Sequence, residues 1–165
     1  MNIRDARESD AAAVHAIYAH HVLNGTASYD IDPPPPDYIQ EKIRWILGRG
    51  WPFLVTEEQG EAIGYAYATQ FRDRAAYRFT CENSIYVAPE WIRRGVGRAL
   101  LQALIERSGE YGFRTMIAVI GGAEPASIGL HAACGFREVG RLREVGWKKE
   151  RWLDSVYMQR ELPTA

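Results

Sequence analysis

The stretch Thr80-Cys-Glu-Asn-Ser-Ile-Tyr-Val87, with Arg93-Arg-Gly-Val-Gly-Arg98 shortly after it, decides the fold. Residues 80–87 are strand-like in composition. Residues 95–111 carry apolar side chains at helical spacing, and Gly112 ends that pattern. The apolar stripe is made of Val96, Ala99, Leu100, Ala103 and Leu104. The segment therefore predicts a strand, a turn rich in arginine and glycine, and then a helix.

Similar patterns in the rest of the chain predict the other helices and strands. Further strands are expected over residues 2–6, 53–56, 62–68, 115–120, 137–145 and 152–162, and further helices over residues 9–25, 37–48 and 127–135, with Ser9, Asp37 and Ser127 as N-caps. The order is then β-α-α-β-β-β-α-β-α-β-β, which combines hairpins with crossover helices. It predicts an α/β (α+β) fold with a mixed, mostly antiparallel sheet flanked by helices, in a single domain over residues 1–165.

Charge and composition exclude several classes of protein. A net charge of -1 argues against a nucleic-acid binder, and no apolar run approaches membrane-spanning length. Cys81 and Cys134 have neither the spacing of metal ligands nor that of a disulfide framework, so we expect buried thiols in a reducing compartment. The N-terminal MNIRDARESD is charged where a signal peptide needs an apolar core. We expect a cytoplasmic protein with no membrane, nucleic-acid or metal partner.

The turn between the strand and the long helix has the features of a phosphate-binding site. Residues 90–98 end at a helix start, where backbone N–H groups lack intrahelical partners and the helix dipole favours an anion. Gly95 and Gly97 let the backbone approach a bulky ligand, and Arg93, Arg94 and Arg98 add positive charge. The pattern favours a diphosphate. The alternative is an ordinary helix start with solvated arginines.

Glu82 interrupts an otherwise strand-like segment just ahead of that turn. A carboxylate deep in a domain is costly unless it is paired or functional, and burial would raise its pKa toward the range of a general base. The alternative is a glutamate on an edge strand, facing water. The residues alone leave both interpretations open.

Three other groups of polar or aromatic residues stand out. Arg72, Arg74 and Arg78 are suited to binding a carboxylate, although surface arginines in a loop are the commoner explanation. His131 is a lone helix histidine, a type that is more often structural than catalytic. The histidines of the first helix are expected to be structural or solvated. The aromatic side chains near the C-terminus, at Trp147, Trp152 and Tyr157, are expected in the core or at an interface.

Several segments together resemble the GCN5-related N-acetyltransferase (GNAT) superfamily, and within it the phosphinothricin and methionine sulfoximine acetyltransferases. The likeness covers nearly the whole chain. Its landmarks are Asn24-Gly-Thr-Ala-Ser-Tyr29, Arg78-Phe-Thr-Cys-Glu-Asn-Ser-Ile-Tyr-Val87, Arg94-Gly-Val-Gly-Arg-Ala-Leu100, Ala126-Ser-Ile-Gly-Leu-His131, Gly135-Phe136 and Trp152-Leu-Asp154. Two positions depart from the family pattern: Ile92 stands where Gln or Arg is usual, and Glu124 where an asparagine usually contacts the cofactor.

The resemblance implies roles for particular residues. It implies that Glu82 matches the family's general base. His131 stands where many relatives carry a tyrosine that protonates the departing thiolate, which makes it a second candidate catalytic residue. The residues implied in binding acetyl-CoA are Ile85, Tyr86, Val87, Arg93, Arg94, Gly95, Val96, Gly97, Arg98, Glu124 and Ser127. The residues expected to bind the acceptor are Arg72, Arg74, Arg78 and Tyr29.

The activity implied by this resemblance is transfer of acetyl from acetyl-CoA to the α-amine of a small amino acid or analogue, such as methionine sulfoximine, methionine sulfone or phosphinothricin. Direct transfer with Glu82 as base requires no covalent enzyme intermediate, and a backbone N–H near residues 85–87 would polarise the thioester. The resemblance also implies a homodimer. The alternatives are an acetyltransferase for peptide or protein N-termini, and a catalytically silent acyl-CoA-binding or nucleotide-binding module.

Overall fold

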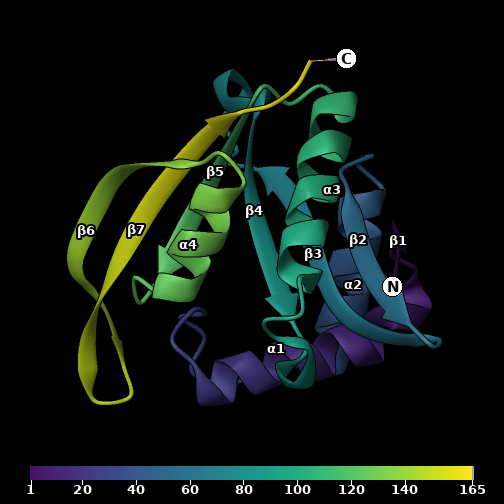
Figure 1. Ribbon diagram of the computed structural model, residues 1–165, viewed down its shortest axis with the longest axis horizontal. Coiled ribbons are helices and arrows are strands. Elements are labelled where there is room, and N and C mark those ends of the chain that lie inside the picture. Colours follow the sequence, from purple (N-terminus) through teal and green to yellow (C-terminus); the bar gives the residue numbers. More distant parts are fainter. Residues whose placement is uncertain (165) are drawn as a thin grey trace.

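A computed structural model describes residues 1–164 and contains one seven-stranded sheet with α-helices on both faces (Figure 1). The strands are β1 (Asn2–Asp5), β2 (Phe53–Glu58), β3 (Glu61–Gln70), β4 (Thr80–Val87), β5 (Thr115–Gly121), β6 (Arg137–Lys148) and β7 (Arg151–Glu161), and the helices are α1 (Ala11–Asn24), α2 (Pro36–Leu47), α3 (Val96–Tyr111) and α4 (Pro125–Ala133). Their order across the sheet is β1-β2-β3-β4-β5-β7-β6. Among the strand pairs within residues 1–164, only β4–β5 is parallel. The predicted element order and the mixed, mostly antiparallel sheet are confirmed.

Two of the predicted helix caps are wrong because prolines begin those helices. Helix α2 starts at Pro36 rather than after Asp37, and α4 starts at Pro125, which leaves Ser127 inside its first turn. Proline suits the first helical position because its fixed φ matches the helix and its missing N–H would have no partner there. These starts precede the polar residues that the sequence pattern favoured as caps.

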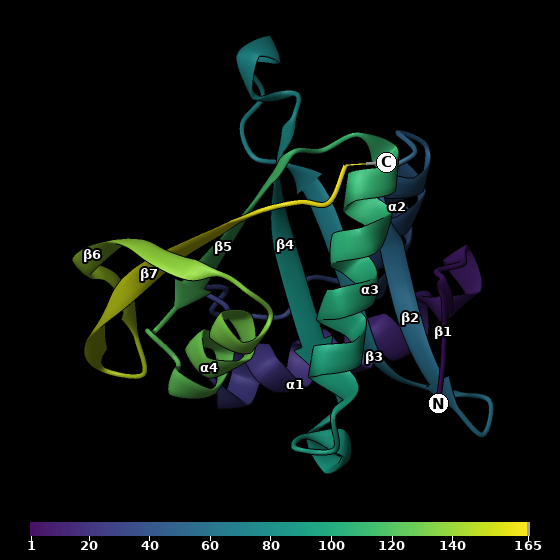
Figure 2. The ribbon, with the colours of Figure 1, turned by 45° about the horizontal axis from the view of Figure 1, so that its top comes forward.

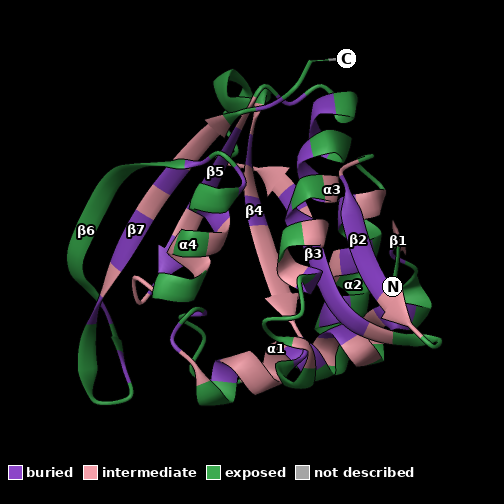
Figure 3. Ribbon diagram, in the orientation of Figure 1, coloured by how far each residue is buried: buried purple, intermediate pink, exposed green. Residues whose placement is uncertain are grey.

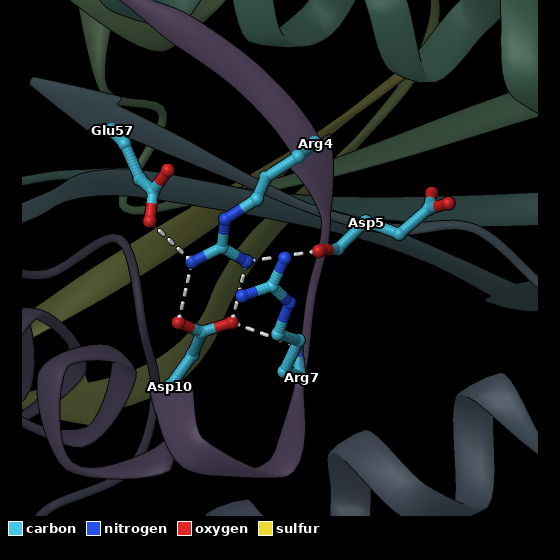
Figure 4. Close-up of polar contacts among 5 residues, drawn as sticks. All are labelled: Arg4, Asp5, Arg7, Asp10 and Glu57. Atoms are coloured by element: carbon cyan, nitrogen blue, oxygen red, sulfur yellow. Dashed lines mark hydrogen bonds and ion pairs between the residues drawn. The ribbon is translucent and has the colours of Figure 1, made fainter. Parts of the chain in front are cut away.

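The predicted cap at Ser9 is also wrong, because a short 3₁₀ turn over Glu8–Asp10 places Asp10 at the cap position of α1. The Asp10 carboxylate accepts two hydrogen bonds of 2.8 Å from the guanidinium of Arg4 and one of 2.7 Å from the backbone N–H of Arg7 (Figure 4). Arg4 also donates to Glu57 on β2. This network ties β1, the start of α1 and the second strand together.

Two apolar clusters fill the two sides of the sheet. Helix α3 covers one face, and α1 and α2 cover the other (Figures 1 and 2). On one side, Leu100, Leu101 and Leu104 of α3 are fully buried. On the other, Ile39 and Ile43 of α2 pack against the second and third strands. Because successive strand residues face opposite sides, β4 contributes to both clusters and lies in the middle of the fold.

Strand β6 is much more exposed than the rest of the sheet, whereas its partner β7 is exposed mainly at its ends (Figure 3). Trp147 and Trp152 pack edge to face with ring centroids 5.0 Å apart, yet they are 55% and 59% exposed. Their predicted place in the core is therefore wrong, and an interface remains the other expectation. None of the helices within residues 1–164 combines the length and the apolarity needed to cross a membrane.

Candidate active site

The parallel strands β4 and β5 separate partway along their length. They pair only at Thr80–Thr115, Cys81–Met116 and Glu82–Ile117, although β4 continues to Val87 and β5 to Gly121. Figure 2 shows the two strands fanning apart from their paired ends. Beyond Glu82, therefore, one side of β4 has no neighbouring strand.

The alternation of strand hydrogen bonds identifies the backbone groups that face this opening. The Thr80 C=O and the Ala88 N–H bond to the β3 side, and the β3–β4 register contains no bulge between them. The backbone groups of the intervening odd-numbered residues, Asn83, Ile85 and Val87, therefore point toward the separated strand. These groups are available to pair with an extended polar ligand, except the Val87 C=O, which accepts a 2.7 Å hydrogen bond from the Nε2 of His21.

Two cavities follow the opening and meet along it. The first, of about 270 Å³, is lined by residues 82–86 of β4, residues 118–121 of β5 and the side chains of Ser127 and His131. The second, of about 410 Å³, continues past Ile85–Val87 to Arg93, Gly95, Gly97 and Arg98. Both cavities touch Ala27, Ile85, Tyr86 and Ser127. Together they form one cleft from the arginine–glycine turn to Glu82.

The arginine–glycine turn has free amide groups at its end of the cleft. Gly95 has φ 82°, a left-handed conformation that favours glycine, and it precedes the first residue of α3. The first backbone hydrogen bond of the helix runs from the Ala99 N–H to the Gly95 C=O, so the N–H groups of residues 96–98 have no intrahelical partner. Arg93, Arg94 and Arg98 are exposed around them. The predicted phosphate-binding features are thus gathered at one site.

Glu82 is half-buried on an interior strand, which excludes the edge-strand alternative. Burial raises the pKa of its carboxyl group, while Arg72 and Lys42 partly offset that rise. Glu82 also lines a third cavity of about 520 Å³, on the α2 side of the sheet, whose walls include Lys42, Trp45 and Tyr67. Its carboxylate therefore lies where the cleft and this third cavity meet.

His131 is almost fully buried at the wall of the cleft. Its Nδ1 lies 2.8 Å from the Ser127 carbonyl oxygen, so Nδ1 carries a proton, and its Nε2 lies 3.2 Å from the side-chain amide of Asn83. Burial lowers the pKa of His131 and favours the neutral ring. The Asn83 amide then fits best with its NH₂ toward Nε2, which also gives a partner to an otherwise unpaired Nδ2.

The loop after α1 closes one side of the cleft. A Cβ on Gly121 would lie 2.7 Å from the Ala27 carbonyl oxygen, so only glycine permits this close approach. The Thr26 hydroxyl donates a 2.6 Å hydrogen bond to Glu124, and the Tyr29 hydroxyl bonds to the last strand. Glu124 thus holds the loop and, within the described residues, lines neither part of the cleft.

The predicted arginine cluster lies on an exposed loop that projects beyond the ends of β3 and β4 (Figure 2). Arg72 stacks on Phe71 at 4.1 Å, and Arg78 stacks on Phe79 at 4.5 Å. Arg72 is close enough to influence Glu82, but none of the three arginines lines the cleft or the third cavity. Arg72 therefore acts on Glu82 from outside these cavities.

Three residues at the site were not predicted from the sequence to have a role there. Lys42 borders the apolar stripe of α2, three residues after Ile39, and this position was the available signal. His21 reaches the β4 carbonyl across 66 residues of sequence, so no local pattern identifies it. Asn83 directly follows Glu82 and points to the opposite face of the strand, toward His131.

Comparison with known proteins agrees with this geometry. A family profile described as "Acetyltransferase (GNAT) domain" matches residues 3–157. The phosphinothricin N-acetyltransferase of Alcaligenes faecalis is 49% identical over 97% of this chain and 82% of its own length. The L-methionine sulfoximine/L-methionine sulfone acetyltransferase of Salmonella typhimurium is 38% identical over 98% of this chain and 95% of its own length. A phosphinothricin acetyltransferase from Sinorhizobium meliloti, solved in complex with AcCoA, superposes with a TM-score of 0.95 at 48% identity, over 98% of this chain and 88% of that one.

The fold and the cleft define an N-acetyltransferase of the GNAT type. Within that superfamily, the chain belongs to the phosphinothricin and methionine sulfoximine N-acetyltransferase family.

Proposed function

We propose that this protein transfers the acetyl group of acetyl-CoA to the α-amine of a small amino acid of the phosphinothricin or methionine sulfoximine kind. The observation that carries the proposal is the position of Glu82, a half-buried carboxylate between a long cleft on one side and a separate cavity on the other. A donor and an acceptor entering from the two sides would meet at this residue.

The cleft suits acetyl-CoA in shape and in chemistry. The free N–H groups of residues 96–98 and the exposed arginines Arg93, Arg94 and Arg98 would bind the diphosphate. The amides of the pantetheine arm would pair with the Val87 N–H and the Ile85 C=O, in place of the missing strand. The thioester would then lie beside Glu82. Ile92 costs the site one polar side chain, but the backbone donors do not depend on it.

The chemistry follows from the groups around that point. An α-amine with a pKa of about 8 is mostly protonated at neutral pH, and Glu82 would take its proton directly or through water. The amine nitrogen attacks the thioester carbonyl carbon while the backbone N–H of Ile85 stabilises the oxyanion. The C–S bond then breaks, and the second proton of the attacking nitrogen passes to the thiolate. Neutral His131, whose Nε2 carries no proton, is the candidate relay that accepts this proton and hands it on.

The acceptor is proposed to bind in the cavity on the α2 side of Glu82. Arg72 is the arginine of the loop after β3 that lowers the pKa of Glu82, and it is the candidate partner of the acceptor's α-carboxylate, with Arg74 and Arg78 on the same loop. Tyr29 lines the cleft opposite the strand, and its hydroxyl is already engaged with Ser155. Its role is therefore more to shape the site than to donate a free hydrogen bond.

A homodimer remains a proposal, which the exposed apolar side chains of the C-terminal hairpin support. Val145, Trp147 and Trp152 are each more than half exposed, and such a cluster is typical of an interface. A monomeric mass at micromolar concentration in sedimentation experiments would exclude the dimer.

A cytoplasmic location is likewise proposed, since both cysteines are free and buried, as expected in a reducing compartment.

The decisive experiment measures thiol release from acetyl-CoA with a panel of phosphinothricin, methionine sulfoximine, methionine sulfone, ordinary amino acids and peptides. Turnover of the amino-acid analogues supports the proposal. Turnover of peptides alone would favour the acetyltransferase for N-termini. Binding of acetyl-CoA without turnover of any amine would favour the silent acyl-CoA-binding module.

A further inference from the structure

We propose that Lys42 is a specificity-determining residue that selects acceptors whose side chain carries a negative charge. Lys42 lies on α2 and lines the cavity on the far side of Glu82 from the cleft. The inference rests on the proposed function, because it assumes that this cavity holds the acceptor. It goes further by naming the acceptor's side-chain chemistry.

The surroundings of Lys42 leave its charge without an ionic partner. Its Nζ lies 4.8 Å from the ring centroid of Tyr67 and 5.7 Å from that of Tyr38. Within residues 1–164, no carboxylate lies within ion-pair distance of it. An ammonium group withdrawn from water is costly unless it is paired. An anion brought in by the ligand would supply the missing partner.

The ammonium nevertheless keeps its charge. Burial by itself lowers the pKa of Lys42, but Tyr67, Tyr38 and Asp30 raise it more, so the pKa lies above its ordinary value. Glu41 also lines the cavity, but it is exposed at the rim, where solvent and salt screen its charge. Apart from the proposed base Glu82, the half-buried charge that lines this cavity is therefore Lys42, and it is positive.

Two cations on different elements act on Glu82. Arg72, on the loop after β3, and Lys42, on α2, both lower its pKa. An amino acid with an anionic side chain carries two negative groups and one amine. Arg72 would take the α-carboxylate, Lys42 would take the side-chain anion, and the amine would face Glu82. A phosphinate fits this arrangement, whereas a neutral sulfone offers Lys42 only an uncharged acceptor.

The test compares phosphinothricin with methionine sulfone in the full-length Lys42→Met variant, which preserves side-chain length and removes the charge. We expect KM for phosphinothricin to rise on the order of 10- to 100-fold. KM for methionine sulfone should change less than about threefold, the change expected when no ion pair is lost. Lys42→Arg should keep the preference for phosphinothricin. Lys149→Met is the matched control, because Lys149 is an exposed lysine bonded to the Leu23 carbonyl, away from the cavity.

Calorimetric binding of both acceptors to the CoA-bound protein gives a second readout that needs no turnover. A drop of tenfold or more in the preference for phosphinothricin supports the inference. Equal losses for both acceptors, or no loss for either, would overturn it, as would a wild-type protein that binds neither. If wild type binds phosphinothricin but acetylates only peptides, the proposed function fails while the binding ratio still decides the role of Lys42.

Discussion

Replacing Glu82 with glutamine removes the proposed base while keeping nearly the same side-chain shape. The expected decrease in kcat depends on the role of the carboxylate. A general base that accepts the proton during attack contributes about 10² to 10⁴ in rate, or about 2.7 to 5.4 kcal/mol of barrier. A carboxylate that only shifts the protonation equilibrium of the amine contributes less. At pH 7 about one tenth of an amine with a pKa near 8 is already neutral, which limits the loss to about tenfold.

The pH profile separates these two roles. Because burial raises the pKa of Glu82, wild-type activity should fall on the acid side at a pH above the ordinary pKa of glutamate, and Glu82→Gln should lack this limb. A loss that persists at pH 9.5 indicates proton transfer during attack, and a loss that vanishes there indicates the equilibrium role. The assay is thiol release at saturating acetyl-CoA, with Glu106→Gln on the exposed side of α3 as the control. A near-normal kcat for Glu82→Gln at every pH would refute the reasoning.

Three further perturbations test other parts of the molecule. Arg98→Gln should weaken acetyl-CoA binding by about tenfold at low salt, because a charge-assisted contact to phosphate is lost; titration calorimetry at two salt concentrations checks both the size and the screening. His131→Asn should lower kcat on the order of 10²-fold with little change in acetyl-CoA Kd, and an unchanged kcat would remove His131 from the reaction. Asp10→Asn should lower the free energy of unfolding at pH 7 by about 1 to 3 kcal/mol. Arg4 holds the pKa of Asp10 below its usual value. The contribution of Asp10 to the free energy of unfolding is therefore full above about pH 4 and is lost as the pH falls further. Urea unfolding at pH 7 and at pH 2 should show that the difference between wild type and variant shrinks at the lower pH.

The sequence predicted the element order because each element has a local signal. The strand over residues 80–87 was predicted to its last residue, and Gly112 ends α3 as expected. The caps failed where two local signals competed: the prolines at 36 and 125 set the helix starts ahead of the polar residues that follow them. Periodicity thus decided which elements form, and details of backbone chemistry decided where they begin.

The site was less predictable, because it forms between elements that are distant in sequence. Glu82 and the turn at residues 93–98 belong to one continuous segment, so their association could be anticipated. The contribution of Lys42 depends on how α2 packs against the third strand. Its position beside the apolar stripe indicates the helix face, but it does not indicate the partner across the cavity. Glu124 was predicted from the sequence to bind the cofactor, because it stands at a position where the family usually has a cofactor-binding asparagine. In the structure it accepts a hydrogen bond from Thr26 instead.

The separation of β4 and β5 has a consequence for folding stability. It leaves an internal sheet edge with unpaired backbone groups, and such edges invite pairing with other chains. A donor molecule lying in the cleft would cap that edge and bind only the folded state. At a concentration one hundred times its Kd, it would add about 2.7 kcal/mol to the free energy of unfolding. The amount of folded enzyme in a cell would then follow the supply of acetyl-CoA. The substrate that the enzyme consumes would also stabilise its fold.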